Sequence, residues 1–239
     1  MNQKVPRITT AIFDMDELML DSAYWHNAVF EAVMKKYGRS FRGPNSPLTN
    51  EREVGLFGLS ILDVFKLLVQ WYDLEGKAKP EKMAQQFADL IVPFFEKSDI
   101  RPMAGLLPLI KDFQKHRFRF GLASSARKSK IDVVLKKFRL VDVFKYIVSG
   151  EDEIRHGKPA PKIFLKAAEK IGSKPSECIV LEDAKNGVKA AKAAGMYCIG
   201  VHNMNIYKRL GMMQDLSGAD IQVHSLKELS VNKIIKLLK

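Results

Sequence analysis

Two different hydrophobic patterns divide the chain. From residue 101 onward, short apolar runs alternate with stretches whose apolar positions recur every three or four residues. The short runs are RFRFGLAS, YIVSG, CIVLED, YCIGVH and DIQVHS, and the periodic stretches begin at residues 105, 128, 161, 186 and 225. Regular alternation of strands and helices predicts an α/β fold, with a parallel sheet covered by helices on both faces.

Residues 23 to 97 have a different pattern. Helical periodicity covers 23–38, 60–74 and 79–98, and strand patterns are lacking. The apolar run ITTAIFDMD precedes this region and predicts the first strand of the sheet. We therefore expect a discontinuous core of residues 1–21 and 98–239, with a helical cap inserted at 22–97. Ligands should bind between the two parts, at the carboxyl ends of the parallel strands.

The composition is that of an ordinary globular enzyme, with 46% hydrophobic and 28% charged residues. No apolar run approaches the ~18 residues of a membrane span, and the N-terminal segment MNQKVPRITT has no apolar stretch typical of a signal peptide. Cys178 and Cys198 lie in apolar runs, which predicts buried, reduced strand residues rather than a disulfide. From these absences we expect a cytoplasmic protein without a membrane partner.

The net charge of +12 raises the question of a polyanionic partner such as nucleic acid. The basic residues are spread thinly, however, and most stand at helical spacings beside apolar neighbours, as in VVLKKF. This distribution is typical of solvated helix faces. We expect no nucleic-acid partner, a monomer, and attraction of small phosphorylated anions.

Two aspartates follow the first predicted strand, Asp14 and Asp16 in the sequence AIFDMDE. In an extended chain, residues i and i+2 point the same way, so both should face the crevice. Their mutual repulsion is relieved by a divalent cation, or by a division of labour between a nucleophile and a proton carrier. A simple acidic turn, in which Asp16 caps a helix, is the alternative.

A second acidic pair, Glu182 and Asp183, ends another predicted strand in CIVLEDAKNG. Because parallel strands end at one edge of a sheet, the four carboxylates should surround one point. Hard oxygen ligands suit Mg²⁺, which prefers a few protein ligands together with substrate phosphate. The alternative for Asp183 is a helix N-cap.

Two further polar groups stand at predicted strand ends or helix starts. Ser124 and Ser125 end the strand in GLASSAR, and their hydroxyl and backbone N–H groups suit phosphoryl oxygens. Lys158 precedes the proline-initiated helix in HGKPAPKIF and is a suitable counter-charge for a phosphate and a carboxylate.

The ordered set DMD, LASS, GKPAP and LEDAKNG resembles the haloacid dehalogenase superfamily, over essentially the whole chain. It is most similar to the branch of helical-cap phosphatases and phosphomutases that act on sugar phosphates and nucleotide-derived phosphates. The resemblance implies a Rossmann-like sheet with a four-helix cap, in agreement with the pattern of the sequence. It also implies a Mg²⁺-dependent phosphatase that hydrolyses a small phosphorylated metabolite.

The resemblance implies a role for each motif residue. Asp14 would attack phosphorus and form an aspartyl-phosphate, and Asp16 would protonate the leaving group and then deprotonate water. Ser124 and Lys158 complete the catalytic set, and Lys158 would neutralise charge on Asp14 and on the phosphoryl group. The predicted metal ligands are Asp14, Asp16, Asp183 and Glu182, with Asp16 contributing its backbone carbonyl. The predicted substrate-binding residues are Ser124, Ser125, Lys158 and His26.

Several alternatives remain open. A phosphomutase resembles this chain around His26, but Ile61 stands where such enzymes need a cap arginine for the second phosphate. A dehalogenase of the same superfamily needs neither Mg²⁺ nor Asp16, and a phosphonate hydrolase needs a cap lysine for a Schiff base. A phosphate-binding protein without catalytic activity is the candidate from another class.

Glu17 is the departure from the family pattern, because relatives usually have glycine after the second aspartate. Glutamate there adds a side chain, and its charge would repel an anionic substrate by about 3 kcal/mol at ~5 Å. We expect Glu17 to point outward, toward the cap or solvent; a weakly active or non-catalytic homologue is the alternative. The sequence does not identify the substrate.

Overall fold

A six-stranded sheet forms the centre of the computed structural model, which describes residues 8–238. Its strand order is β3-β2-β1-β4-β5-β6, and every neighbouring pair is parallel. The predicted α/β fold with a parallel sheet is therefore confirmed. The strands are β1 (Thr10–Phe13), β2 (Arg119–Ser124), β3 (Tyr146–Ser149), β4 (Cys178–Glu182), β5 (Tyr197–Val201) and β6 (Ile221–Val223).

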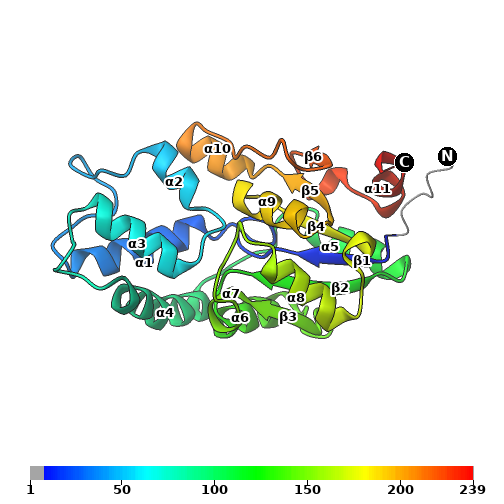
Figure 1. Ribbon diagram of the computed structural model, residues 1–239, viewed down its shortest axis with the longest axis horizontal. Helices are drawn as coiled ribbons and strands as arrows, with labels where there is room; N and C mark the ends of the chain where they lie inside the picture. Colours follow the sequence, from blue (N-terminus) through cyan, green and yellow to red (C-terminus); the bar gives the residue numbers. More distant parts are fainter. Residues whose placement is uncertain (1–7, 239) are drawn as a thin grey trace.

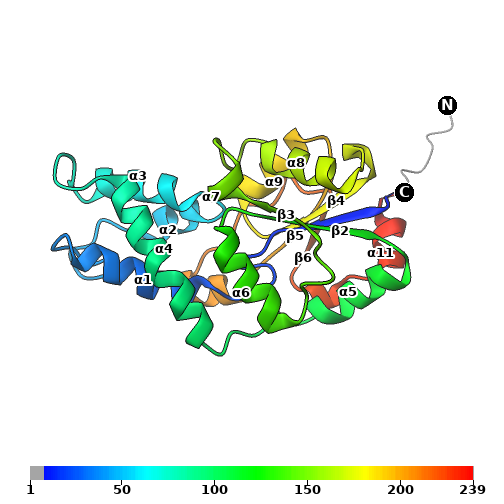
Figure 2. The same cartoon turned by 90° about the horizontal axis from the view of Figure 1, so that it is seen from below.

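Helices cover both faces of the sheet (Figure 2). α8 (Lys162–Ile171) and α9 (Lys185–Ala193) lie on one face, and α5 (Leu106–Lys115), α6 (Lys128–Phe138) and α11 (Val231–Leu237) lie on the other. The period of two in β1 divides its side chains between these layers. Ile12 packs in the cluster that includes α8 and α9, whereas the ring of Phe13 lies 6.0 Å from that of Phe113 in α5.

Four helices between β1 and α5 extend beyond one end of the sheet (Figure 1). They are α1 (Ala23–Lys35), α2 (Asn50–Leu56), α3 (Ile61–Trp71) and α4 (Pro80–Lys97). Their shared core is aromatic: Phe30 of α1 lies 4.6 Å from Phe87 of α4 and 5.5 Å from Phe65 of α3, between ring centroids. We call these helices and their connecting loops the cap. The boundaries 22–97 stay a prediction.

Three short helices were not expected from the periodicity: α2, α7 (Gly150–Glu153) and α10 (Met204–Leu210). Each spans two turns or fewer, too short for a repeating apolar pattern. Polar N-caps start them instead, and Asn203 accepts hydrogen bonds from the backbone N–H groups of Asn205 and Ile206 at the start of α10.

The predicted C-terminal helix at 225–239 is divided in two. A 3₁₀ turn covers Leu226–Glu228, and α11 begins only after Ser230. The Ser230 side chain accepts a hydrogen bond from the N–H of Lys233, so it acts as an N-cap inside the apolar pattern. Residues 1–7 of the predicted core and Lys239 of this predicted helix lie outside the described residues.

The sheet register brings the functional strand ends together. Phe13 pairs with Leu122 of β2 on one side and with Leu181 of β4 on the other. The residues that follow Phe13, Leu122 and Leu181 therefore lie side by side at one edge, facing the cap. Cys178 and Cys198 are buried in β4 and β5 and are not joined by a disulfide. Within residues 8–238, no helix has the length and apolar character needed to cross a membrane.

Candidate active site

Three strand ends form a buried polar edge beneath the cap. Asp14 follows β1, Ser124 ends β2, and Glu182 and Asp183 lie at the end of β4. The backbone N–H of Asp14 donates to the carbonyl of Leu181 at 3.0 Å, which fixes the first and last of these ends relative to each other. All four side chains are at least nine-tenths buried. The structure thus places these four predicted site residues together.

Lys158 supplies positive charge to this edge from the loop before α8. Its Nζ donates to Asp14 Oδ1 at 2.6 Å and also to Glu182 Oε1. Burial acts to lower the pKa of Lys158, but the two carboxylates outweigh it and raise the pKa above its ordinary value. The side chain therefore stays an ammonium group, and one cation faces three buried acids.

The acidic group fits a divalent cation. Carboxylate oxygens of Asp14, Glu182 and Asp183 lie within 4.8 Å of one another. Asp183 Oδ2 is buried and has no hydrogen-bond partner among the described residues. Such an orphaned oxygen is costly unless a cation or a proton is bound to it. Oxygen ligands with an open, water-accessible side are those that Mg²⁺ prefers.

Glu182 differs from the two aspartates, because both of its oxygens already have partners. Oε1 accepts from Lys158, and Oε2 accepts from the backbone N–H groups of Asp183 and Ala184 at 2.7 and 3.0 Å. A side chain at Gly187 would clash with it, since a Cβ there would lie 1.6 Å from Oε1. Glu182 is therefore suited to orient Lys158 and the loop that carries Asp183, rather than to contact the metal directly.

The carboxylates are protonated more easily than ordinary acids. Burial raises the pKa of Asp14 to about 7, with Lys158 opposing the shift and Glu182 adding to it. Burial and the charges of Glu182 and Asp14 raise the pKa of Asp183 well above its usual range. Protons and a cation would therefore compete for the same oxygens, as expected for a metal site whose ligands must be deprotonated.

Asp16 lies at the same edge, but its carboxylate has other partners. Asp16 Oδ1 accepts from Lys130 Nζ at 2.6 Å and lies 3.7 Å from His26 Nε2. Burial acts to raise the pKa of Asp16, but Lys130, with smaller contributions from His26 and Ser22, outweighs it, and the pKa is lowered. The carboxylate does not belong to the acidic group described above. The predicted metal contact through the Asp16 backbone carbonyl stays a prediction.

His26 enters the site from α1 of the cap. Its Nε2 lies 2.6 Å from Lys130 Nζ, and its ring lies between Phe87 and Phe95, at 5.8 and 6.1 Å. Burial and the neighbouring ammonium lower the pKa of His26 to about 3. The ring is therefore neutral near pH 7, and its Nε2 accepts a hydrogen bond from Lys130.

Ser124 and Ser125 face different neighbours. Ser124 is almost completely buried, lines the cavity, and accepts a hydrogen bond from the N–H of Ala126 through its Oγ at 3.2 Å. The hydroxyl of Ser125 donates to the carbonyl of Gly58 in the cap at 3.1 Å. In this arrangement, Ser125 contacts the cap, while Ser124 stands next to the acidic edge.

Of the two outward directions expected for Glu17, the structure excludes solvent, because only 3% of the residue is exposed. Oε1 accepts from the N–H and hydroxyl of Ser22, the residue before α1, and Oε2 accepts from Asn203 Nδ2 at 2.9 Å. Its φ of +63° is left-handed, a conformation for which glycine is the usual residue. The side chain therefore turns toward the start of the cap and the loop after β5.

Glu17 carries little charge near neutral pH. Burial, with a contribution from Asp21, raises its pKa to about 8. A protonated glutamic acid does not repel an anionic substrate as an ionised one does. The repulsion between Glu17 and an anionic substrate is therefore weaker than the sequence predicts, although Glu17 lines the cavity.

The cavity lies between the cap and the acidic edge and encloses about 110 Å³. All four cap helices contribute apolar side chains to it, among them Phe30, Leu56, Ile61, Val64, Phe87 and Ile91. Asp14, Asp16, Ser124 and Asp183 line its floor. The structure thus presents a polar reaction edge to a mostly apolar chamber.

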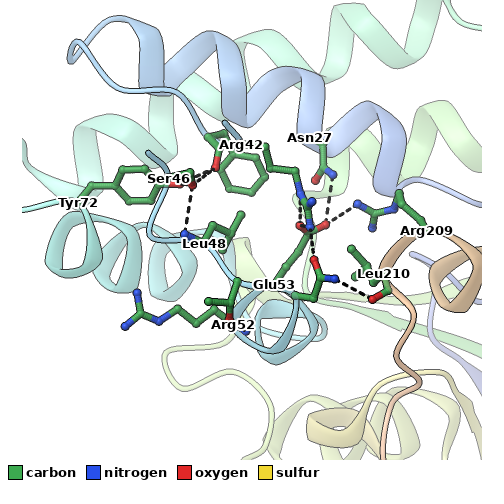
Figure 3. A network of polar contacts seen from close by, with 12 residues as sticks. Asn27, Arg42, Ser46, Leu48, Arg52, Glu53, Tyr72, Arg209 and Leu210 are labelled. Carbon is green, nitrogen blue, oxygen red and sulfur yellow. Dashed lines mark hydrogen bonds and ion pairs between the residues drawn. The ribbon is translucent and has the colours of Figure 1, made fainter. Parts of the chain in front are cut away.

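A buried glutamate joins the cap to the core beside this cavity (Figure 3). Glu53 of α2 accepts from Arg209 of α10 at 2.5 Å and from Arg42 of the cap at 2.5 Å, with Asn27 as a further donor. On the same helix, Asn50 Nδ2 donates to the carbonyl of Leu210 at 2.8 Å. These bonds between α2 and α10 hold the cap over the site in this structure.

Sequence analysis missed Lys130, Glu53, Arg209 and Asn203. For Lys130 a signal existed, because it falls in the helical register of the buried residues Ile131 and Val134. Because its neighbours Lys128 and Ser129 are polar, the sequence RKSK is typical of a solvent-exposed helix start. Glu53, Arg209 and Asn203 lie in or beside helices too short to show a pattern.

The comparisons with known proteins agree with this geometry. Residues 11–201 match the family model described as haloacid dehalogenase-like hydrolase. The chain therefore belongs to the haloacid dehalogenase-like hydrolase family, which confirms the expected superfamily and its hydrolase class.

Among similar proteins is a probable pseudouridine-5'-phosphatase of Drosophila melanogaster, 31% identical over 205 residues, with 84% of each chain covered. The β-phosphoglucomutase of Bacillus subtilis is 27% identical over 226 residues, covering 92% of this chain and 91% of its own. A solved β-phosphoglucomutase from Clostridium difficile superposes with a TM-score of 0.81 at 25% identity, covering 97% of both chains. The chain is thus similar in sequence to both a phosphatase and a mutase, and similar in fold to a mutase.

The acidic edge predicts how pH and Mg²⁺ act on stability. The folded-state pKa of Asp14, about 7, exceeds the value of 3.8 expected when the chain unfolds. The folded state then binds more protons between these values, so the metal-free protein should lose stability as pH rises from 5 to 8. Mg²⁺ should raise the melting temperature more at pH 8 than at pH 5. Calorimetry with EDTA or Mg²⁺ measures this, and an equal shift at both pH values would contradict it.

The Glu17 contacts predict the effect of Glu17→Gly. Glycine relieves a left-handed conformation that costs roughly 1–2 kcal/mol, but it removes three hydrogen bonds, each contributing about 0.5–1.5 kcal/mol. It also leaves a buried space. We expect a net loss of about 1–2 kcal/mol in unfolding free energy, measured by urea denaturation. Glu75→Gly, in an exposed loop, is the control; a more stable Glu17→Gly would show that strain outweighs the contacts.

Proposed function

We propose that this protein is a Mg²⁺-dependent phosphatase that hydrolyses a small phosphorylated metabolite through an aspartyl-phosphate intermediate. The observation that carries the proposal is the position of Asp14. Its carboxylate stands at the centre of the strand-end edge, paired with Lys158 at 2.6 Å, and the unpartnered oxygen of Asp183 lies nearby. A carboxylate held between a buried cation and a candidate metal site suits attack on a phosphoryl group.

The proposed reaction has two steps. In the first, an Asp14 oxygen attacks phosphorus, the ester P–O bond breaks, and Asp16 gives a proton to the departing oxygen. Asp16 must first take up that proton, although the charge of Lys130 acts to lower its pKa. In the second, Asp16 takes a proton from water, the resulting hydroxide attacks phosphorus, and the bond to Asp14 breaks to release inorganic phosphate. Ser124 and Lys158 hold the phosphoryl oxygens in both steps. Bound Mg²⁺, held by Asp14, Asp183 and the Asp16 carbonyl, would neutralise charge on those oxygens.

The lining of the cavity supports hydrolysis over a mutase reaction. Within residues 8–238, no lysine or arginine of the cap lines the cavity. Ile61, the first residue of α3, stands where the resemblance to mutases implies an arginine. Glu53, the acidic cap residue that lines it, is held by Arg42 and Arg209 and offers no counter-charge to a second phosphate. The basic core residues Arg127 and Lys130 already have partners, Glu151 and Asp16 respectively. The substrate therefore carries one phosphate on an uncharged, partly apolar group.

The relatives support the same class of substrate. The Drosophila protein is named for a nucleoside monophosphate and the Bacillus protein for a sugar phosphate. A phosphorylated carbohydrates phosphatase of Thermotoga maritima is also similar, at 26% identity over 207 residues. We place this chain with the phosphatases because the mutase-specific cationic group is missing from the described part of its cap cavity.

Substitution of the two aspartates tests the mechanism. Asp14→Asn should abolish turnover because an amide does not attack phosphorus. Asp16→Asn should lower kcat/KM by about 10²-fold or more for a monophosphate with a poor leaving group. Phosphate release with Mg²⁺ is the assay, EDTA treatment should abolish it, and circular dichroism checks folding. Full activity in EDTA, or wild-type kcat/KM in Asp16→Asn, would contradict the assignment.

A substrate panel tests the nature of the leaving group. We expect kcat/KM for 2-phenylethyl phosphate to exceed that for glucose 1,6-bisphosphate at least tenfold, because the chamber is apolar and its cap residues offer no counter-charge. Ile61→Arg should raise kcat/KM for the bisphosphate and so reduce the ratio of the two kcat/KM values. Leu62→Arg, at the neighbouring position that does not line the cavity, is the control and should leave this ratio unchanged. Preference of the wild type for the bisphosphate would count for the mutase alternative.

A further inference from the structure

Lys130 is a buried cation that none of the roles above uses. It lies in the first turn of α6, with 3% of the residue exposed, although α6 belongs to the helices that cover the sheet. Its Nζ contacts Asp16 Oδ1 and His26 Nε2, both at 2.6 Å. The same ammonium lies 4.8 Å from the centre of the Phe95 ring in α4. One side chain of the core thus contacts the acid–base aspartate and two helices of the cap.

Burial of this ammonium requires compensation. A lysine is rarely buried so completely unless its charge is paired, and an aromatic face adds a weaker attraction. The ion pair with Asp16 supplies the pairing, and the neutral ring of His26 accepts a second hydrogen bond. Two of the three ammonium hydrogens then have fixed directions, so the contacts define where Nζ lies and hence where Asp16 Oδ1 lies.

We infer that Lys130 is a positioning residue that orients Asp16 for proton transfer to the leaving group when the cap is closed. The inference rests on the proposed phosphatase reaction. Lys130 contacts Oδ1 of Asp16, so Oδ2 is the oxygen that this contact leaves available, and Asp16 lines the cavity in which the departing oxygen would lie. Because His26 and Phe95 belong to the cap, the geometry around Lys130 is complete only when the cap packs against α6.

Other cationic groups at the cavity do not provide this contact. Lys158 is paired with Asp14 and Glu182. Arg127 donates to Glu151 at 2.7 Å and to Gln85 of α4 at 3.0 Å, so it joins the cap to the core without contacting Asp16. Among the described residues, Lys130 is the lysine or arginine whose side chain forms an ion pair with Asp16.

The test uses leaving groups that depend differently on protonation. p-Nitrophenolate departs without a proton, whereas the 2-phenylethyl alkoxide needs one, so only 2-phenylethyl phosphate depends on Asp16 as an acid. The quantity to compare is kcat/KM with Mg²⁺, because it reports the steps up to departure of the leaving group. Water activation in the later step does not enter it.

We expect Lys130→Met to lower kcat/KM for 2-phenylethyl phosphate at least 30-fold and for p-nitrophenyl phosphate less than fivefold. Lys130→Arg keeps a cation and should recover part of the loss. Lys128→Met, on the same helix but exposed and paired with Asp132, is the matched control and should change neither substrate. If Lys130→Met does not fold, Lys130→Arg carries the comparison, with a smaller loss that is again selective for 2-phenylethyl phosphate.

A double substitution separates positioning from packing. In Asp16→Asn, the further change Lys130→Met should cost less than threefold for 2-phenylethyl phosphate, because the group that Lys130 orients is already lost. Equal losses on both substrates, or additive losses in the double variant, would overturn the inference while leaving the phosphatase proposal intact. Absence of Mg²⁺-dependent hydrolysis by the wild type on every substrate would overturn both.

Discussion

The ammonium group of Lys158 is the interaction on which the catalytic edge depends. The sheet register forces Asp14, Glu182 and Asp183 into a small buried volume, where their mutual repulsion and desolvation oppose folding. Lys158 is the protein cation that contacts two of them. Loss of one partner from such a buried pair typically costs about 3–5 kcal/mol, because the remaining charge stays uncompensated. The site therefore holds more negative than positive charge, and a divalent cation bound together with the substrate would neutralise the excess.

The position of the cap over the core depends on a second set of charged residues. Glu53 joins α2 to α10 through Arg209, while Lys130 and Arg127 join α6 to α1 and α4. Contacts to the core thus come from two sides of the cavity, and the apolar chamber lies between them. Such an arrangement allows the cap to exclude water from the reacting groups while its inner wall remains free to contact the leaving group.

Much of the fold could be predicted because the strands and longer helices carry clear periodicity and the motif residues stand at strand ends. The convergence of Asp14, Ser124, Glu182 and Asp183 follows from parallel strand order alone. Other features depend on tertiary contacts that leave no local pattern. Glu53 and Arg209 lie 156 positions apart in short helices, and Lys130 resembles the solvated lysines around it. The direction of Glu17 required the position of Asn203, which no spacing in the sequence reveals.

Glu17 and Asn203 depend on each other at the position where the family resemblance implies glycine. Asn203 donates to both the carbonyl and the carboxyl group of Glu17, and its own Oδ1 caps α10. A single exchange at position 17 would remove one of the two contacts of Asn203 Nδ2, and a single exchange at 203 would leave Oε2 of the buried Glu17 without its partner. The two positions are thus coupled through a direct contact, so a substitution at one of them changes the effect of a substitution at the other.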